Sequence, residues 1–250
     1  MGVFDVYEAR INAKGRTKRG AALQREKKYL RDHLPDNLSY QEAVIDGEAR
    51  LVSIANSDNL NEKTIFSLPN EDLRHGALVE WMDNRWLITE RDANTTIYTK
   101  CKMIQCNYLL KWINKDHQII EQWSVVSDGT KYLTGEFEDK LFMATRGDTR
   151  LSVILANTPE SAKLDRQSRF LIDDTRAGDI IAYSLTKPLR MGWSYNGNGV
   201  FQFVLQEVVT TDDDNLDLMI ADYYKHFPHE YPPGNSAEDV PPPATGEVWF

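Results

Sequence analysis

At 250 residues the chain is long enough to bury one large core or two small ones without help from disulfides or metal ions. Its composition, 41% hydrophobic and 27% charged, excludes a fibrous repeat and a chain that is disordered throughout. The net charge of −9 is uneven: residues 1–31 hold nine Lys or Arg against three acids, a net of +6, which leaves −15 for the rest. This asymmetry favours protein partners or self-assembly over a small substrate.

The sequence gives no sign of a membrane partner or an oxidising compartment. No stretch approaches the roughly 20 apolar residues that cross a bilayer, and the first residues lack the apolar core of a signal peptide. Cys101 and Cys106 lie five apart in an expected strand and so point to opposite faces, which predicts two reduced thiols and no disulfide. We therefore expect folding in the cytoplasm.

Residues 1–34 are expected to form a basic N-terminal arm with a short helix. Up to about Gly20 the chain is polar, basic and interrupted by glycine, which predicts little structure of its own. Good helix formers follow over residues 21–33, until Pro35 ends the helix. The candidate partner-binding residues of this arm are Lys14, Arg16, Lys18, Arg19 and Arg25.

Two kinds of partner suit these basic residues. They can neutralise nucleic-acid phosphates, or they can dock on an acidic protein surface such as the tail of another copy. No aromatic residues are interleaved with them and no nucleic-acid motif accompanies them, so docking on protein is the stronger expectation.

Residues 35–122 predict a small β-barrel domain. Strand-like runs alternate with turn residues, and the firmest local feature is a tight hairpin with Asp83-Asn84 as its two-residue turn. This hairpin places Trp81 near Trp86 across the two strands, where they supply a large apolar area to the core.

Residues 123–225 predict a second, sandwich-like β domain. Apolar runs of about five to nine residues are separated by Gly, Asp and Asn at the spacing typical of sandwiches and barrels. The boundary between the two β domains is placed near Trp123. The predicted fold class is therefore mainly β, with a small barrel, a second sandwich-like block, a short N-terminal helix and extended arms.

Residues 226–250 predict an acidic, proline-rich C-terminal arm. Such a composition favours an extended linker. It ends in Val248, Trp249 and Phe250, an apolar group suited to strand addition or pocket docking on a neighbour. A frayed terminus is the alternative.

Metal and cofactor motifs are not evident. His226 and His229 have metal-like spacing, but no third ligand lies nearby in the sequence. The run from Asp212 to Asp214, with Asp217, lacks the glycine and the terminal glutamate of a calcium loop, so a solvated turn is expected. We expect neither a metal ion nor a cofactor.

Catalytic motifs are not evident either. There is no phosphate-binding loop and no nucleophile elbow. For a polymer hydrolase, Glu136, Glu138 and Asp139 are the only clustered carboxylates, and an exposed hairpin explains them more simply. The sequence predicts no catalytic residues, and therefore a protein that is not an enzyme.

Two parts of the chain carry a resemblance to known proteins: HGALVEWMDNRWLITERDANTTIYTKCKMIQCNYLLKWI, and less specifically SRFLIDD, IAYSLTKPLRMG and YNGNGVFQFVLQEV. They resemble the head-closure (stopper) and head–tail connector proteins of tailed bacteriophages that infect Gram-positive bacteria, over about residues 10 to 225. The chain is longer than a minimal stopper, which suggests that the second β block is an added domain.

The resemblance implies a structural protein in the neck of the virion, folded in the host cytoplasm. It implies a ring of six or twelve copies between the portal or adaptor and the tail proteins, through which DNA passes without sequence-specific binding. The alternative is another tail, baseplate or decoration protein.

Overall fold

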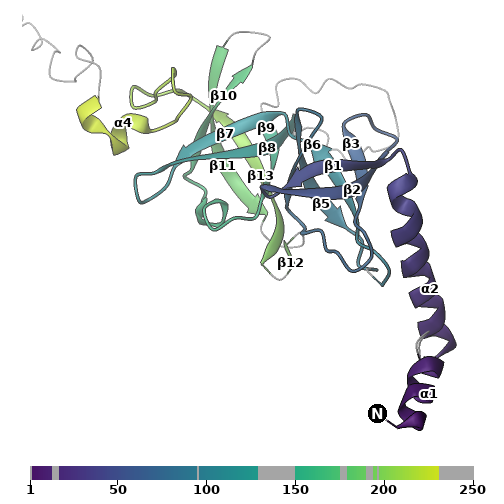
Figure 1. Ribbon diagram of the computed structural model, residues 1–250. Coiled ribbons are helices and arrows are strands. Elements are labelled where there is room, and N and C mark those ends of the chain that lie inside the picture. Colours follow the sequence, from purple (N-terminus) through teal and green to yellow (C-terminus); the bar gives the residue numbers. More distant parts are fainter. Residues whose placement is uncertain are drawn as a thin grey trace, which may run out of the picture.

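The structure is a computed structural model that describes residues 2–12, 17–94, 96–128, 150–174, 179–189, 194–195 and 197–230. Figure 1 shows two β units packed together, with a helical arm leading away from the first unit. The predicted fold class, mainly β with a short N-terminal helix, is confirmed.

The arm contains two helices, α1 (Val3–Asn12) and α2 (Lys18–His33), followed by the 3-10 turn η1 (Leu34–Asp36). The prediction of little structure before Gly20 was wrong. The Asp5 carboxylate accepts a hydrogen bond of 2.8 Å from the backbone N–H of Gly2 and so caps α1. Helix α2 begins before the expected residue 21 because Thr17 is its N-cap, accepting 3.0 Å from the N–H of Gly20.

The first β unit is a closed antiparallel barrel, which confirms the predicted small barrel. Its strands are β1 (Tyr40–Ile45), β2 (Glu48–Asn56), β3 (Glu62–Phe66), β4 (Leu78–Trp81), β5 (Asn84–Arg91) and β6 (Lys100–Gln105), in the order β1-β2-β3-β6-β5-β4. Pairing of β4 with β1 closes the ring. Alternate residues face inward, as in Ala43 and Ile45 of β1, and their side chains form the core of the barrel.

The predicted β4–β5 hairpin is present, with its turn one residue earlier than expected. Met82 and Asp83 occupy the two left-handed positions, with φ of 51° and 57°, and Trp81 pairs with Asn84. Asn84 stabilises the turn from the strand instead, donating 2.7 Å to the carbonyl of Met82. The rings of Trp81 and Trp86 lie 5.9 Å apart, as predicted.

The second β unit is one curled sheet. Its strands are β7 (Tyr108–Ile113), β8 (Ile119–Asp128), β9 (Arg150–Ala156), β10 (Arg169–Asp174), β11 (Asp179–Leu189) and β13 (Asn198–Val208), in the order β10-β11-β13-β9-β8-β7, with β12 (Ser194–Tyr195) paired to β13. Three short elements complete it: η2 (Ser161–Lys163), α4 (Tyr223–His226) and η3 (Pro228–Glu230). Residues 226–230, assigned from the sequence to the C-terminal arm, thus form helical turns.

The chain passes from the barrel to the second sheet at Cys106 and Asn107, not near Trp123 as expected. The N–H of Cys106 still donates to the barrel, 2.8 Å from the carbonyl of Arg85. The amide side chain of Asn107 pairs instead with Val126 of β8, accepting from its N–H and donating to its carbonyl, each at 2.7 Å. Asn107 is therefore the first residue bonded to the second sheet, in a stretch that contains no Gly or Pro to mark the change.

A tyrosine hydroxyl joins the two edge strands of the second sheet. The hydroxyl of Tyr108, on β7, donates a hydrogen bond of 3.2 Å to the carbonyl of Leu171 and accepts one of 3.2 Å from the N–H of Asp173. Both partners lie on β10. The curled sheet is thereby tied into a barrel-like form without a continuous backbone ladder between these two strands.

We expect Tyr108→Phe to lower the free energy of unfolding by about 1–2 kcal/mol, because it leaves two backbone groups of β10 without their partner. Urea denaturation followed by tryptophan fluorescence measures the change. Tyr98→Phe is the matched control, since the Tyr98 hydroxyl makes no hydrogen bond within the described residues and its ring packs on Phe66. Equal losses in both variants would contradict a bridging role for Tyr108.

The two β units meet through a small apolar cluster and a close backbone approach. Leu87 and Cys106 of the barrel side contact Ala156 and Val200 of the second sheet. The guanidinium of Arg85 lies 4.8 Å from the ring centre of Trp123 on β8. The units therefore share a packed interface in addition to the chain that joins them.

Gly76 has no side chain at this interface for a steric reason. A Cβ atom at Gly76 would lie 1.9 Å from the carbonyl oxygen of Gly199, and the φ of Gly76 is +82°. The Gly199 carbonyl is itself held by the N–H of Asn157, at 2.9 Å. Glycine at position 76 is thus required by both its conformation and its neighbour.

Candidate functional site

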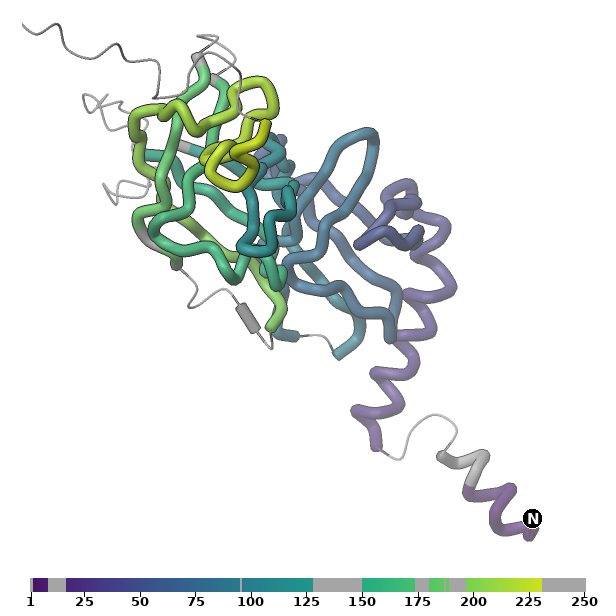
Figure 2. Tube along the Cα trace, turned by 90° about the vertical axis from the view of Figure 1, so that its left-hand side faces the viewer, coloured from purple at the N-terminus to yellow at the C-terminus, as the bar shows by residue number. Residues whose placement is uncertain are grey.

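The predicted basic residues of the arm are solvent-exposed where the structure describes them. Lys18, Arg19 and Arg25 lie on α2, a helix without a buried residue. Lys14 and Arg16 lie outside the described residues. Helix α2 contacts the barrel through Lys27, whose ammonium donates 2.9 Å to the side chain of Asn70. Figure 2 shows the arm leaving the barrel and α1 standing clear of both β units.

Helix α1 carries an exposed apolar face. Val3 and Phe4 are each 86% exposed and Tyr7 is 64% exposed. Their spacing of three and four residues puts them on one side of the helix. This face has nothing to pack on among the residues that the structure describes.

A second feature is a groove on the outer face of strands β2, β1 and β4. It consists of two hollows of about 700 Å³ and 480 Å³ that share Glu42. We call it the acidic groove, and its lining residues include Tyr40, Glu42, Ala49, Arg50, Leu51, Leu68, Glu71, Asp72, Glu80, Met82, Asp83 and Arg85. Outward-facing residues form the floor, because Glu42 pairs with Leu51 and Val44 pairs with Ala49 and Glu80 across the strands.

The groove is negatively charged. Five carboxylates line it against two arginines. Glu80 pairs with Arg85 at 3.2 Å, whereas Glu42 and Glu71 make no ion pair within the described part of the chain. Burial, and then the negative charge of Glu71, raise the pKa of Tyr40. The field in the groove therefore favours a cationic partner.

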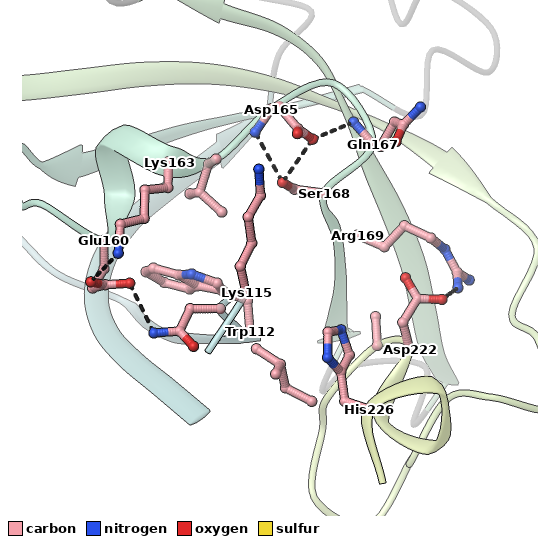
Figure 3. A pocket seen from close by; sticks show the side chains of 14 residues that line it. Trp112, Lys115, Glu160, Lys163, Asp165, Gln167, Ser168, Arg169, Asp222 and His226 are labelled. Carbon is pink, nitrogen blue, oxygen red and sulfur yellow. Dashed lines mark hydrogen bonds and ion pairs between the residues drawn. The ribbon is translucent and has the colours of Figure 1, made fainter. Parts of the chain in front are cut away.

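A third feature is an ion-pair cluster beside a pocket of about 200 Å³ in the second β unit. Figure 3 shows the pocket with two members of the cluster, Arg169 and Asp222. Arg169 of β10 donates to both oxygens of Asp214, each at 2.9 Å, and to Asp222 at 2.8 Å. The Asp214 side chain is fully buried and also accepts from the N–H groups of Thr211 and Asp222. Asp214 is therefore not part of a solvated turn, as the sequence suggested, but the centre of this cluster.

The charge of Asp214 is held by its hydrogen bonds. Burial alone works to raise the pKa of this carboxyl group. The backbone N–H groups of Asp222 and Thr211, together with Arg169, outweigh burial and hold the pKa below its ordinary value. The cluster fixes the segment after β13 against β10, which is a structural role.

Two histidines meet next to this pocket. The Nδ1 atoms of His117 and His226 lie 3.1 Å apart, joining the β7–β8 connection to α4. His229 lies beyond them, with its ring 6.3 Å from that of Phe227. Among the described residues no group of three His, Cys, Asp or Glu is arranged to hold a metal ion.

This histidine pair predicts a loss of stability at mildly acidic pH. Burial lowers the pKa of His226 below its ordinary value of 6.5, and the nearby His117 lowers it further. The unfolded chain therefore binds a proton first, so stability is full above about pH 6.5 and falls as the pH drops through the lower folded pKa. We expect the wild-type Tm to fall between pH 7.5 and pH 5.5 and His226→Gln to reduce that fall, whereas His229→Gln leaves it unchanged. An undiminished fall in His226→Gln would contradict this assignment.

The remaining predicted residues fall into two groups. Val248, Trp249 and Phe250 lie outside the described residues, as do the carboxylates Glu136, Glu138 and Asp139. Both cysteines are described: Cys101 lies in the barrel core and Cys106 in the cluster between the units. Burial raises the pKa of each thiol to about 12, so both are poor nucleophiles.

The basic arm was predictable from the sequence, but the surfaces that complement it were not. The acidic groove joins residues from four strands, a loop and a turn, and the Arg169 cluster joins residues more than 40 positions apart. Only the alternation of Glu42 with inward-facing Ala43 in β1 pointed to an exposed carboxylate.

These features define a protein with two barrel-like β units and an exposed basic helical arm. Residues 10–105 match the family model of the YomX N-terminal domain, a region that contains α2 and the whole first barrel. The family is phage-derived, so the match fits a phage protein in general. Neither a curated protein nor a solved structure matches the chain. No helix in the described ranges is long and apolar enough to cross a membrane.

Proposed function

We propose that the chain is a structural protein of a tailed-phage particle, which forms a ring in the head–tail connector, joins the portal to the tail and lets DNA pass. Its neighbours in this proposal are further copies of itself, in a ring of six or twelve, and the portal or adaptor and tail proteins. The role is not enzymatic and uses no cofactor.

The observation that carries the proposal is the extent of the phage-family match. It includes the basic helix α2 together with the closed barrel, so both fall within one domain of that family model. A barrel with a projecting charged arm suits a subunit that binds its neighbours in a ring. The net charge of −15 outside residues 1–31 also suits a channel wall that DNA passes without being held, because like charges repel.

The test is to mix the purified protein with DNA-filled capsids of its phage that lack tails, and to image them by negative stain. We expect a ring at the portal vertex, with a copy number readable from averaged end views. Capsids with tails already attached are the control and should bind none. Binding to isolated tails without binding to tail-less capsids would contradict the neck location.

The second candidate is another virion component, in the tail, the baseplate or the capsid decoration. The pocket lined by Trp112, Lys115 and Lys163 favours it, because an aromatic side chain beside charged ones suits a polar ligand such as a glycan. Gold labelling of the protein in whole particles separates the two candidates: label at the neck supports the connector, and label at the tail tip or over the capsid supports the alternative.

A further inference from the structure

We propose that the acidic groove binds the N-terminal arm of a second copy of this chain, with the apolar face of α1 over the groove floor and the start of α2 against its carboxylates. This inference rests on the proposed ring and names the surfaces that would build it. It replaces the acidic tail, considered from the sequence, with a defined surface of the barrel as the acceptor.

Helix α1 needs a partner. A ten-residue helix is marginal in water on its own, and most helices gain their stability by packing an apolar face. Val3, Phe4 and Tyr7 form such a face and are exposed. A binding surface that covers them therefore stabilises the helix itself.

The partner surface belongs to another molecule. The C-terminal half of α2 contacts its own barrel through Lys27 and Asn70. At 1.5 Å per residue, α2 carries the chain about 24 Å away from its C-terminal end. Figures 1 and 2 both show α1 at the far end of α2, remote from the barrel from which the arm starts.

The acidic groove matches the apolar face of α1 and the positive charge at the start of α2. Its floor offers Tyr40, Leu51 and Leu68 to the apolar residues of α1. Its carboxylates Glu42 and Glu71, which form no salt bridge within the described residues, suit the exposed cations Lys18 and Arg19 that follow α1.

The arm and the groove are different surfaces of the same chain. Contact between them is therefore head-to-tail, and repetition of a head-to-tail contact gives a closed ring or an open filament. A symmetric dimer uses one surface twice and does not arise from this contact unless both arms exchange.

Cysteine crosslinking between two variant chains tests the contact. A chain with Phe4→Cys is mixed with a chain carrying Leu51→Cys, as concentrated protein and on assembled particles, and oxidised. The native Cys101 and Cys106 are buried and give little background. The matched control is Leu60→Cys, at an exposed leucine that does not line the groove. We expect at least tenfold more crosslinked dimer with Leu51→Cys than with Leu60→Cys, and equal yields would overturn the proposal.

Charge exchange supplies the second test. One double variant adds Lys18→Glu and Arg19→Glu to the Phe4→Cys chain. The other adds Glu42→Lys and Glu71→Lys to the Leu51→Cys chain. We expect each to reduce the yield of crosslinked dimer about tenfold. Mixing the two charge-reversed chains should restore it. Lys28→Glu with Arg31→Glu, nearer the barrel end of α2, is the control and should leave the yield unchanged. If the crosslink yield does not recover when the two charge-reversed chains are mixed, the charge pairing between arm and groove is rejected.

The outcomes separate this inference from the proposed function. Rings at the portal vertex without the crosslink reject the arm-to-groove contact alone. Crosslinked assemblies that never bind tail-less capsids reject the neck location alone. Absence of the crosslink together with binding to anionic vesicles or to DNA, lost in Lys18→Glu with Arg19→Glu, would assign the arm to those partners and overturn the proposal.

Discussion

Asp214→Asn is expected to lower the free energy of unfolding by about 3–5 kcal/mol, the usual cost of removing one partner from a buried ion pair. The Asp214 side chain is fully buried and receives Arg169 through both oxygens. An amide in its place would present an N–H group toward donors that need an acceptor. Urea denaturation of the full chain, read by near-ultraviolet circular dichroism, measures the loss.

Asp213→Asn is the matched control for this change. Asp213 is partly exposed and lies 3.6 Å from Lys225, so we expect a change within about 0.5 kcal/mol. A loss for Asp214→Asn no larger than that for Asp213→Asn would show that the buried cluster contributes little to stability.

The same carboxyl group predicts acid sensitivity in a lower pH range than the histidine pair. Because the pKa of Asp214 is held below its ordinary value, the unfolded chain takes up the proton first. Its contribution is present above about pH 4 and is lost as the pH falls through the folded pKa. Stability of the Asp214→Asn variant should therefore fall less steeply with acid in that range than stability of the wild type.

Gly76→Ala is expected to lower the free energy of unfolding by about 3 kcal/mol. A left-handed backbone costs about 1–2 kcal/mol for a residue with a Cβ atom, and overpacking of a tight contact adds about 1–3 kcal/mol. The new methyl group would overlap the carbonyl of Gly199, which Asn157 holds in place. The variant must separate the two β units or distort the loop, and both effects are measured by denaturation and by protease sensitivity.

Gly47→Ala separates the cost of a left-handed backbone from the cost of steric overlap. Gly47 has a φ of +86°, almost the same as Gly76, yet a Cβ atom there meets nothing within 4 Å. We expect it to cost about 1 kcal/mol. Equal costs at the two positions would mean that the backbone approach between the units is loose.

The sequence predicted the barrel well because its strands alternate cleanly and its turns carry recognisable residues. The β4–β5 hairpin was placed within one residue, and the shift arose because Met82 takes a left-handed position that its residue type does not signal. The change of sheet at Asn107 was missed because it depends on side-chain hydrogen bonds to Val126, which no local pattern encodes.

Of the two surfaces of the candidate site, only the basic arm was predictable from the sequence. Charged residues of the arm, such as Lys18 and Arg19, stand out in a sequence because their excess is local. The acidic groove depends on which strands become neighbours, since Glu42 and Glu80 lie on β1 and β4 and come together only when the barrel closes. The position of a surface formed by closure follows from topology, which composition and periodicity do not specify.

The place where the chain changes sheet also bears on the order of folding. All six barrel strands precede Cys106, so the barrel can close as soon as about 105 residues have left the ribosome. The second sheet must wait longer, because β7 meets β10 through Tyr108 and β8 pairs with β9 across an intervening segment. Until then Leu78 and Leu87, the barrel leucines of the interface between the two units, are exposed to solvent. A chain arrested in synthesis near residue 150 would therefore have a folded barrel with an exposed apolar face that is prone to aggregation.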